Sequence, residues 1–118
     1  MKLLLLTLSF LAQGTFADDL SPLKIHEGLL ANENKMTVYV FDRDKDGIPT
    51  CYAGCATIWP PVLFPEGEVK APLSIVVRKD QTRQIAYKGK PLYLYADDES
   101  PGDTNGDGIS GIWHIIRP

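Results

Sequence analysis

Basic side chains and long apolar runs are both scarce in this 118-residue chain. Lysine and arginine number 12 against 15 aspartates and glutamates, so the formal net charge at pH 7 is −3. Because nucleic-acid binding draws mainly on clustered lysine and arginine, we expect no nucleic-acid partner. The apolar run from Leu3 to Leu11 is shorter than the roughly 20 residues that cross a bilayer, and no later run is longer. We therefore expect no transmembrane segment.

The start of the chain has the pattern of a signal peptide. Lys2 precedes the apolar run, and the small residue Ala17 stands directly before the acidic pair Asp18-Asp19. A charged start, a short apolar centre and a small residue at the cleavage site are typical of export signals. We predict a signal peptide over residues 1–17 and a soluble protein in the periplasm or the medium. No cysteine follows the apolar run, so we expect no lipid anchor.

Cysteine occurs only twice, at Cys51 and Cys55. On one helical turn these positions would lie about 6 Å apart, within the range that a disulfide accepts. In an oxidising compartment an isolated pair this close is expected to be bridged. We predict a structural disulfide that fixes a tight turn. A redox pair usually has a two-residue spacer, and a zinc site would need two further ligands, so these alternatives have less support.

The chain contains an internal repeat with a period of 54 residues. Shifting the sequence by 54 places segment 38–41 on segment 92–95, and the match continues without a gap. Beyond these segments the identical pairs are Asp44 and Asp98, Thr50 and Thr104, Gly54 and Gly108, Ile58 and Ile112, and Trp59 and Trp113. Chance could give one or two of these, whereas the whole set indicates duplication. We predict a single domain over residues 18–118, built from related units at 38–62 and 92–116.

The local patterns predict a mainly β fold. The β-branched segment from Leu73 to Val77 is typical of a strand, and segment 84–93 has a hairpin signal with Gly89 in its turn. Segment 29–39 is a second hairpin candidate, in which asparagine would supply the positive φ of the turn. The only helix that we expect is one turn from Ala53 to Trp59, ended by the prolines that follow. The predicted fold is a small single domain of short antiparallel strands from two pseudo-repeated units.

Aromatic residues mark corresponding positions of the two units. Each unit begins with a strand that is apolar on both faces and therefore needs cover on both sides, as in a small sandwich. We interpret the aromatic side chains as core packing, with a binding surface as the alternative. They are Tyr39, Phe41 and Trp59 in the first unit, and Tyr93, Tyr95 and Trp113 in the second.

Two motifs resemble those of a known family. A Tyr-x-aromatic-x-x-Asp motif occurs at 39–44 and again at 93–98, and Cys51 opens a Cys-x3-Cys-Ala-x-x-Trp-Pro-Pro stretch. On these motifs nearly all of residues 18–118 resembles the bacterial secreted-repeat lipoproteins of unknown function. The resemblance implies export to the cell envelope, and it implies no activity, substrate or catalytic residue. The chain departs from the lipoproteins of the family in lacking a lipid-accepting cysteine.

Acidic residues are concentrated in two loops. Segments 42–48 and 103–109 each match the start of a calcium loop, with alternate oxygen ligands and glycine at the sixth position. The candidate ligands are Asp42, Asp44, Asp46, Asp103, Asn105 and Asp107. The twelfth positions, Ala53 and His114, lack the bidentate glutamate of an EF-hand. Calcium is therefore an alternative to solvated turns, and we expect no other cofactor.

No recognisable catalytic motif occurs in the chain. We find neither a nucleophile elbow nor a zinc-protease helix motif, and the two histidines are far apart in sequence. We therefore predict a non-catalytic binding or interaction module of the cell envelope, with its contacts on the loops. The alternatives are a calcium-stabilised structural domain and, with less support, an enzyme or a redox or metal-handling protein.

Overall fold

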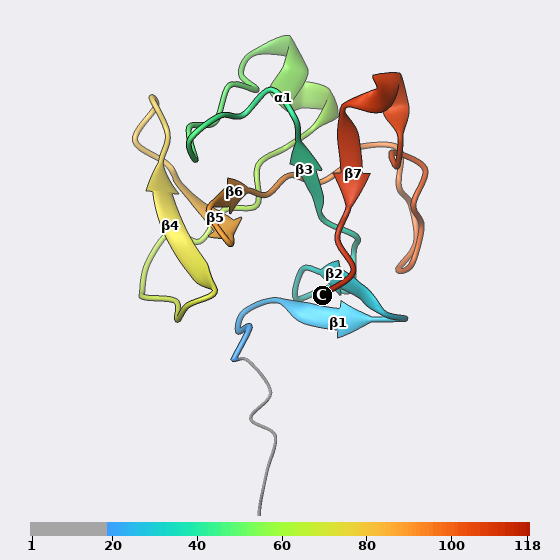
Figure 1. The fold of residues 1–118 in the computed structure, drawn as a ribbon, viewed down its shortest axis with the longest axis horizontal. Helices are drawn as coiled ribbons and strands as arrows, with labels where there is room; N and C mark the ends of the chain where they lie inside the picture. The colour runs from blue at the N-terminus through green and yellow to red at the C-terminus, as the bar shows by residue number, and fades with distance from the viewer. Residues whose placement is uncertain (1–18) are drawn as a thin grey trace, which may run out of the picture.

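The computed structural model describes residues 19–118, so the predicted signal peptide lies outside it. The elements in chain order are β1 (Lys24–His26), β2 (Leu29–Ala31), β3 (Tyr39–Phe41), α1 (Gly54–Ile58), β4 (Leu73–Val77), β5 (Arg83–Tyr87), β6 (Lys90–Pro91), η1 (Ile109–Gly111) and β7 (Trp113–Ile115). They form three small antiparallel sheets, β1-β2, β3-β7 and β4-β5-β6 (Figure 1). The predicted mainly β class is confirmed. Within these residues no helix has the length and apolar character needed to span a membrane.

The β5-β6 hairpin forms where the sequence predicts it. Its turn places Lys88 at φ 48° and Gly89 at φ 80°, the two consecutive positive values that a tight hairpin turn requires. The earlier hairpin corrects one expectation, because Lys35 and not an asparagine takes the positive φ, at 66°. Asn32 serves instead as an acceptor, since its Oδ1 receives the backbone N–H groups of residues 34 and 36, both at 2.9 Å.

The two repeated units are interlocked. Strand β3 of the first unit pairs with β7, the segment that begins at the tryptophan of the second unit. In the corresponding way, Tyr93 of the second unit bridges Pro61, just after the tryptophan of the first. Tyr39 and Tyr93 then exchange backbone hydrogen bonds of 2.8 and 2.9 Å. Each unit therefore completes its sheet with a segment of the other, around a pseudo-twofold axis between these tyrosines.

Alternation along β3 and β7 separates the core into two clusters. Val40 faces an aliphatic cluster that includes Leu30, Ile85 and Leu92. The neighbouring Tyr39 faces the opposite way, into an aromatic cluster that also contains Cys51, Trp59, Tyr93 and Trp113. Successive side chains of a strand point to opposite faces, so both faces of this small sheet are covered.

The disulfide joins Cys55, in the short helix α1, to Cys51 in the loop before it. Cys51 and Cys55 are bridged, with a Cα–Cα distance of 5.2 Å, which confirms the predicted bond. The helix ends at Ile58, close to the predicted end before the proline pair. Arg78, which is buried, donates to the Cys51 carbonyl at 2.7 Å and to Gln84 Oε1 at 2.8 Å. The disulfide loop is thereby attached to the end of the β4-β5 hairpin.

Candidate functional site

Four aromatic rings form one continuous stack between the units. In order they are Phe41, Trp113, Trp59 and Tyr95, with successive centroid separations of 4.0, 3.8 and 4.3 Å. Neighbouring rings come alternately from the first and second unit. The tryptophans are 5% and 4% exposed, and the outer rings are half-buried. The stack therefore packs the two units together, as the core-packing interpretation expects, and only its ends face solvent.

The motif tyrosines and aspartates form two reciprocal clasps. The Tyr39 hydroxyl donates to Asp98 Oδ2 at 2.6 Å, and the Tyr93 hydroxyl donates to Asp44 Oδ2 at 2.7 Å. Each tyrosine thus binds the aspartate of the other unit. Burial, reinforced by the hydrogen bond to the carboxylate, raises the pKa of both tyrosines well above 10. The Tyr-x-aromatic-x-x-Asp motif therefore holds the interlock together.

The candidate calcium ligands take up separate hydrogen-bonding roles. Asp44 Oδ1 accepts the N–H and hydroxyl of Thr50, at 2.8 and 2.7 Å. Asp103 Oδ2 accepts two backbone N–H groups, which lower the pKa of that carboxyl. Asp107 Oδ1 accepts the N–H of Ile115 at 3.2 Å. Asp46 is exposed, and the Asn105 N–H donates to Asp98.

These residues are not gathered around one point. Within residues 19–118, no group of three or more histidine, cysteine, aspartate or glutamate side chains is placed to hold a metal ion. The loop carboxylates instead accept hydrogen bonds that fix turns and the clasps. Calcium binding stays a prediction that this geometry does not require.

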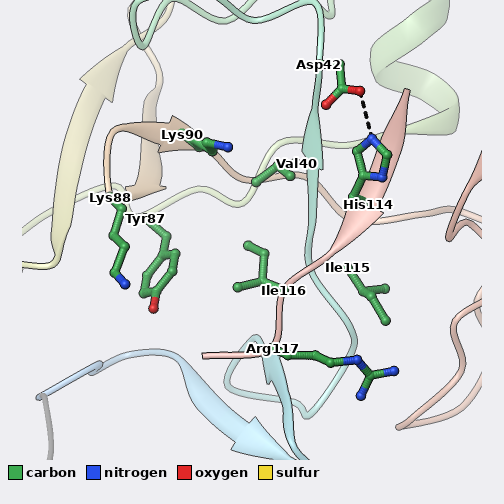
Figure 2. A pocket seen from close by; sticks show the side chains of 9 residues that line it. All are labelled: Val40, Asp42, Tyr87, Lys88, Lys90, His114, Ile115, Ile116 and Arg117. Atoms are coloured by element: carbon green, nitrogen blue, oxygen red, sulfur yellow. Dashed lines mark hydrogen bonds and ion pairs between the residues drawn. The ribbon is translucent and has the colours of Figure 1, made fainter. Parts of the chain in front are cut away.

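The candidate site is a hollow of about 360 Å³ on the aliphatic face of β3 and β7, which we call hollow A (Figure 2). Its lining comes from β3, β7, the β5-β6 turn and the C-terminal segment. The lining residues are Val40, Asp42, Tyr87, Lys88, Lys90, His114, Ile115, Ile116 and Arg117. Val40 lies opposite His114 in the β3-β7 register, so both side chains point to this face. A smaller hollow, which shares Val40 and Lys90, continues toward Phe41.

Hollow A combines an apolar floor with a basic rim. Val40 and Tyr87 are buried, and Ile116 lies between them and the chain end (Figure 2). Lys88 and Lys90 are exposed beside this floor, and the Lys88 ammonium lies 5.3 Å from the Tyr87 ring centre. The Asp42 carboxylate, the acidic group of the lining, is bonded to His114 Nε2 at 2.7 Å.

Reasoning from the sequence missed hollow A, because its walls are 24 or more residues apart along the chain. The signals that could have suggested it are the two lysines around Gly89 and the alternation that puts Val40 and His114 on the face opposite the aromatic residues. A local pattern cannot show that these segments meet.

Comparison with known proteins gives one match. No curated protein and no solved structure matches the chain. The model of a family described as a secreted repeat of unknown function matches residues 28–63 and 74–117, which is more than half of the chain. Each matched segment holds one clasp tyrosine and one clasp aspartate. This exported chain therefore belongs to the family of secreted repeats of unknown function.

Proposed function

We propose that this chain is a non-catalytic binding module of the cell envelope or medium, and that hollow A takes a small anionic ligand with an apolar body. The observation that carries the proposal is the pairing of a buried apolar floor with two exposed lysines in one hollow. The molecule as a whole has a net charge of −3. The basic rim therefore attracts anions to hollow A, while the negative net charge of the protein repels them from the rest of its surface.

The size of hollow A sets the size of the ligand. At about 360 Å³ it lies near the lower end of the range of small-molecule sites, roughly 300–1,000 Å³. An apolar body of a few carbons would cover Val40, Tyr87 and Ile116, and each buried methylene contributes about 0.8 kcal/mol. A carboxylate at one end would then meet Lys88 or Lys90, whose side chains lie on different sides of the floor (Figure 2). Aliphatic or aromatic carboxylates and the C-terminal ends of peptides have this chemistry.

The composition of the lining supports binding over catalysis. His114 and Asp42 form a pair that resembles the base and orienting acid of a nucleophilic site. No serine, threonine or cysteine lines hollow A, however, and the one hydroxyl of the lining is the phenol of Tyr87, so the pair has no aliphatic hydroxyl or thiol to activate there. We therefore assign the pair to the wall of a binding site.

Binding of hexanoate tests the proposal. In amide NMR titrations of the purified protein, we expect saturable shifts at Val40, Lys88 and Ile116. The double variant Lys88→Gln/Lys90→Gln should bind hexanoate about fivefold more weakly, since an exposed charge contact with either lysine contributes up to about 1 kcal/mol.

The matched control is Lys70→Gln/Lys79→Gln, which makes the same change in net charge at exposed positions outside hollow A. This variant should keep the affinity of the original protein. Equal weakening in both double variants, or shifts that do not saturate at hollow A, would overturn the assignment.

A further inference from the structure

A second hollow of about 370 Å³, hollow B, lies beside the segment that follows α1. The residues of its lining that matter here are Asn32, Glu33, Pro61, Val62, Leu63 and Leu94. Leu63 is 44% exposed, so hollow B presents apolar surface to solvent. Neither the acidic loops nor the aromatic stack lines it.

Hollow B occupies the same place in one unit as hollow A does in the other. Four of its residues correspond to residues of hollow A at the repeat distance of 54, namely Leu94 to Val40, Pro61 to Ile115, Val62 to Ile116 and Leu63 to Arg117. In the hairpins the distance is 55, because Ala31 bridges Thr37 whereas Ala86 pairs with Pro91. Asn32 and Glu33 then correspond to Tyr87 and Lys88.

The backbone around the two hollows repeats the same hydrogen bonds. The N–H of Leu30 donates to the Ile116 carbonyl, and the N–H of Ile85 donates to the Val62 carbonyl, both at 2.9 Å. The Leu30 carbonyl in turn accepts the N–H of Val38 at 3.2 Å, and the Ile85 carbonyl accepts the N–H of Leu92 at 3.0 Å. The two hollows are therefore formed by equivalent walls, and duplication produced both.

The linings have diverged in charge. Lys88 at the rim of hollow A is replaced by Glu33 in hollow B, and Arg117 is replaced by Leu63. Glu33 is the one charged side chain in the described lining of hollow B, and all the others are apolar except Asn32. A carboxylate beside an apolar floor attracts cationic ligands, whereas a lysine in the same place attracts anionic ones.

We infer that hollow B is a second binding site, and that it takes a small apolar ligand bearing an ammonium or guanidinium group. The inference shares one premise with the proposed function, namely that these hollows bind ligands. It assigns a different site and a ligand of opposite charge. The protein would thus be a two-site module whose units select ligands by the charges of their corresponding rim residues.

A pair of probes with one tail and opposite charges tests this inference. With hexylammonium we expect saturable amide shifts at Glu33, Leu63 and Leu94, and none at Lys88. Glu33→Gln should weaken hexylammonium binding at least threefold, while Glu99→Gln, the same change at an exposed residue outside both hollows, should leave it unchanged. Glu33→Lys should reverse the preference of hollow B from hexylammonium to hexanoate.

Three results would overturn the inference: no saturable shifts at hollow B, equal affinity for hexylammonium and uncharged hexanol, or equal weakening by the variants at positions 33 and 99. Binding at each hollow shifts the NMR signals of different backbone amides, so hexanoate binding at hollow A is measured independently of hexylammonium binding at hollow B. Failure there with success at hollow B would refute the proposed function alone, and the reverse result would refute this inference alone. An unchanged amide spectrum in each variant confirms that it is folded.

Discussion

Removing one hydroxyl from a clasp should destabilise the interlocked units, and the two clasps should differ. In Tyr39→Phe, Oδ2 of the buried Asp98 carboxylate loses its donor at 2.6 Å, while Oδ1 keeps the hydrogen bond from the Asn105 N–H. The N–H of Gly106 also loses its acceptor at 3.2 Å. A hydrogen bond to a charged group contributes about 1.5–3 kcal/mol, and a buried group left unpaired adds to the loss. We expect Tyr39→Phe to lower the free energy of unfolding by about 3 kcal/mol.

The other clasp should be weaker. Asp44 is half-buried and retains both hydrogen bonds from Thr50 when Tyr93 loses its hydroxyl. Tyr93→Phe should therefore cost about 1.5–2 kcal/mol. Urea unfolding followed by the fluorescence of the two buried tryptophans measures both values. A double-mutant cycle with Asp98→Asn should show coupling to Tyr39 of at least about 1 kcal/mol.

A matched control is Tyr87→Phe, because no hydrogen bond of the Tyr87 hydroxyl is described within residues 19–118. Its effect should stay within about 0.5 kcal/mol. A loss below about 0.5 kcal/mol in both clasp variants would show that the clasps do not hold the units together. A larger loss at Tyr93 than at Tyr39 would refute the argument from burial.

Three further predictions follow from the same contacts. Because burial raises the pKa of both clasp tyrosines above the unfolded value of about 10, their contribution is complete below pH 10. It should fall as the pH rises above 10, measured by urea unfolding from pH 9 to 11, with a shallower fall in either clasp variant. Gly106→Ala should cost about 2 kcal/mol, since its Cβ would lie 2.6 Å from the Trp59 ring, whereas Gly54→Ala, with open space around it, should not destabilise. Millimolar calcium should leave the Tm unchanged relative to excess chelator; a rise of several degrees that Asp107→Ala abolishes would instead support the calcium-stabilised alternative.

Local signals explain how much of the fold the sequence predicted. Strand β4 has the predicted bounds, and the helix and the β5-β6 turn lie at the predicted places, because β-branched runs, glycine and proline act within a few residues. The prediction for the turn before β3 was wrong in detail, because the Asn32 side chain acts as a hydrogen-bond acceptor and Lys35 adopts the positive φ. Both choices make a turn, and the sequence does not distinguish them.

The long-range pairings could not be predicted from local sequence signals. The motif places Tyr39 five residues from Asp44, yet its hydroxyl binds Asp98, 59 residues away. A repeat shows that two units are alike, but it does not show whether they pack side by side or exchange segments. The choice depends on the summed packing of the four-ring stack and both clasps, which no single position encodes. Hollows A and B form only when the units exchange segments, so the sequence could not predict them either.

The interlock also explains where the units are free to differ. Clasp and stack residues contact their counterparts across the pseudo-twofold axis, so a change in one unit must fit a partner in the other. The hairpin positions of Lys88 and Glu33 face solvent and have no such partner across the axis in the described contacts. Duplication can therefore keep one fold while these two positions diverge to opposite charge. For that reason we expect the hollows to determine which ligands this protein binds, and the residues of the Tyr-x-aromatic-x-x-Asp motif to determine its stability.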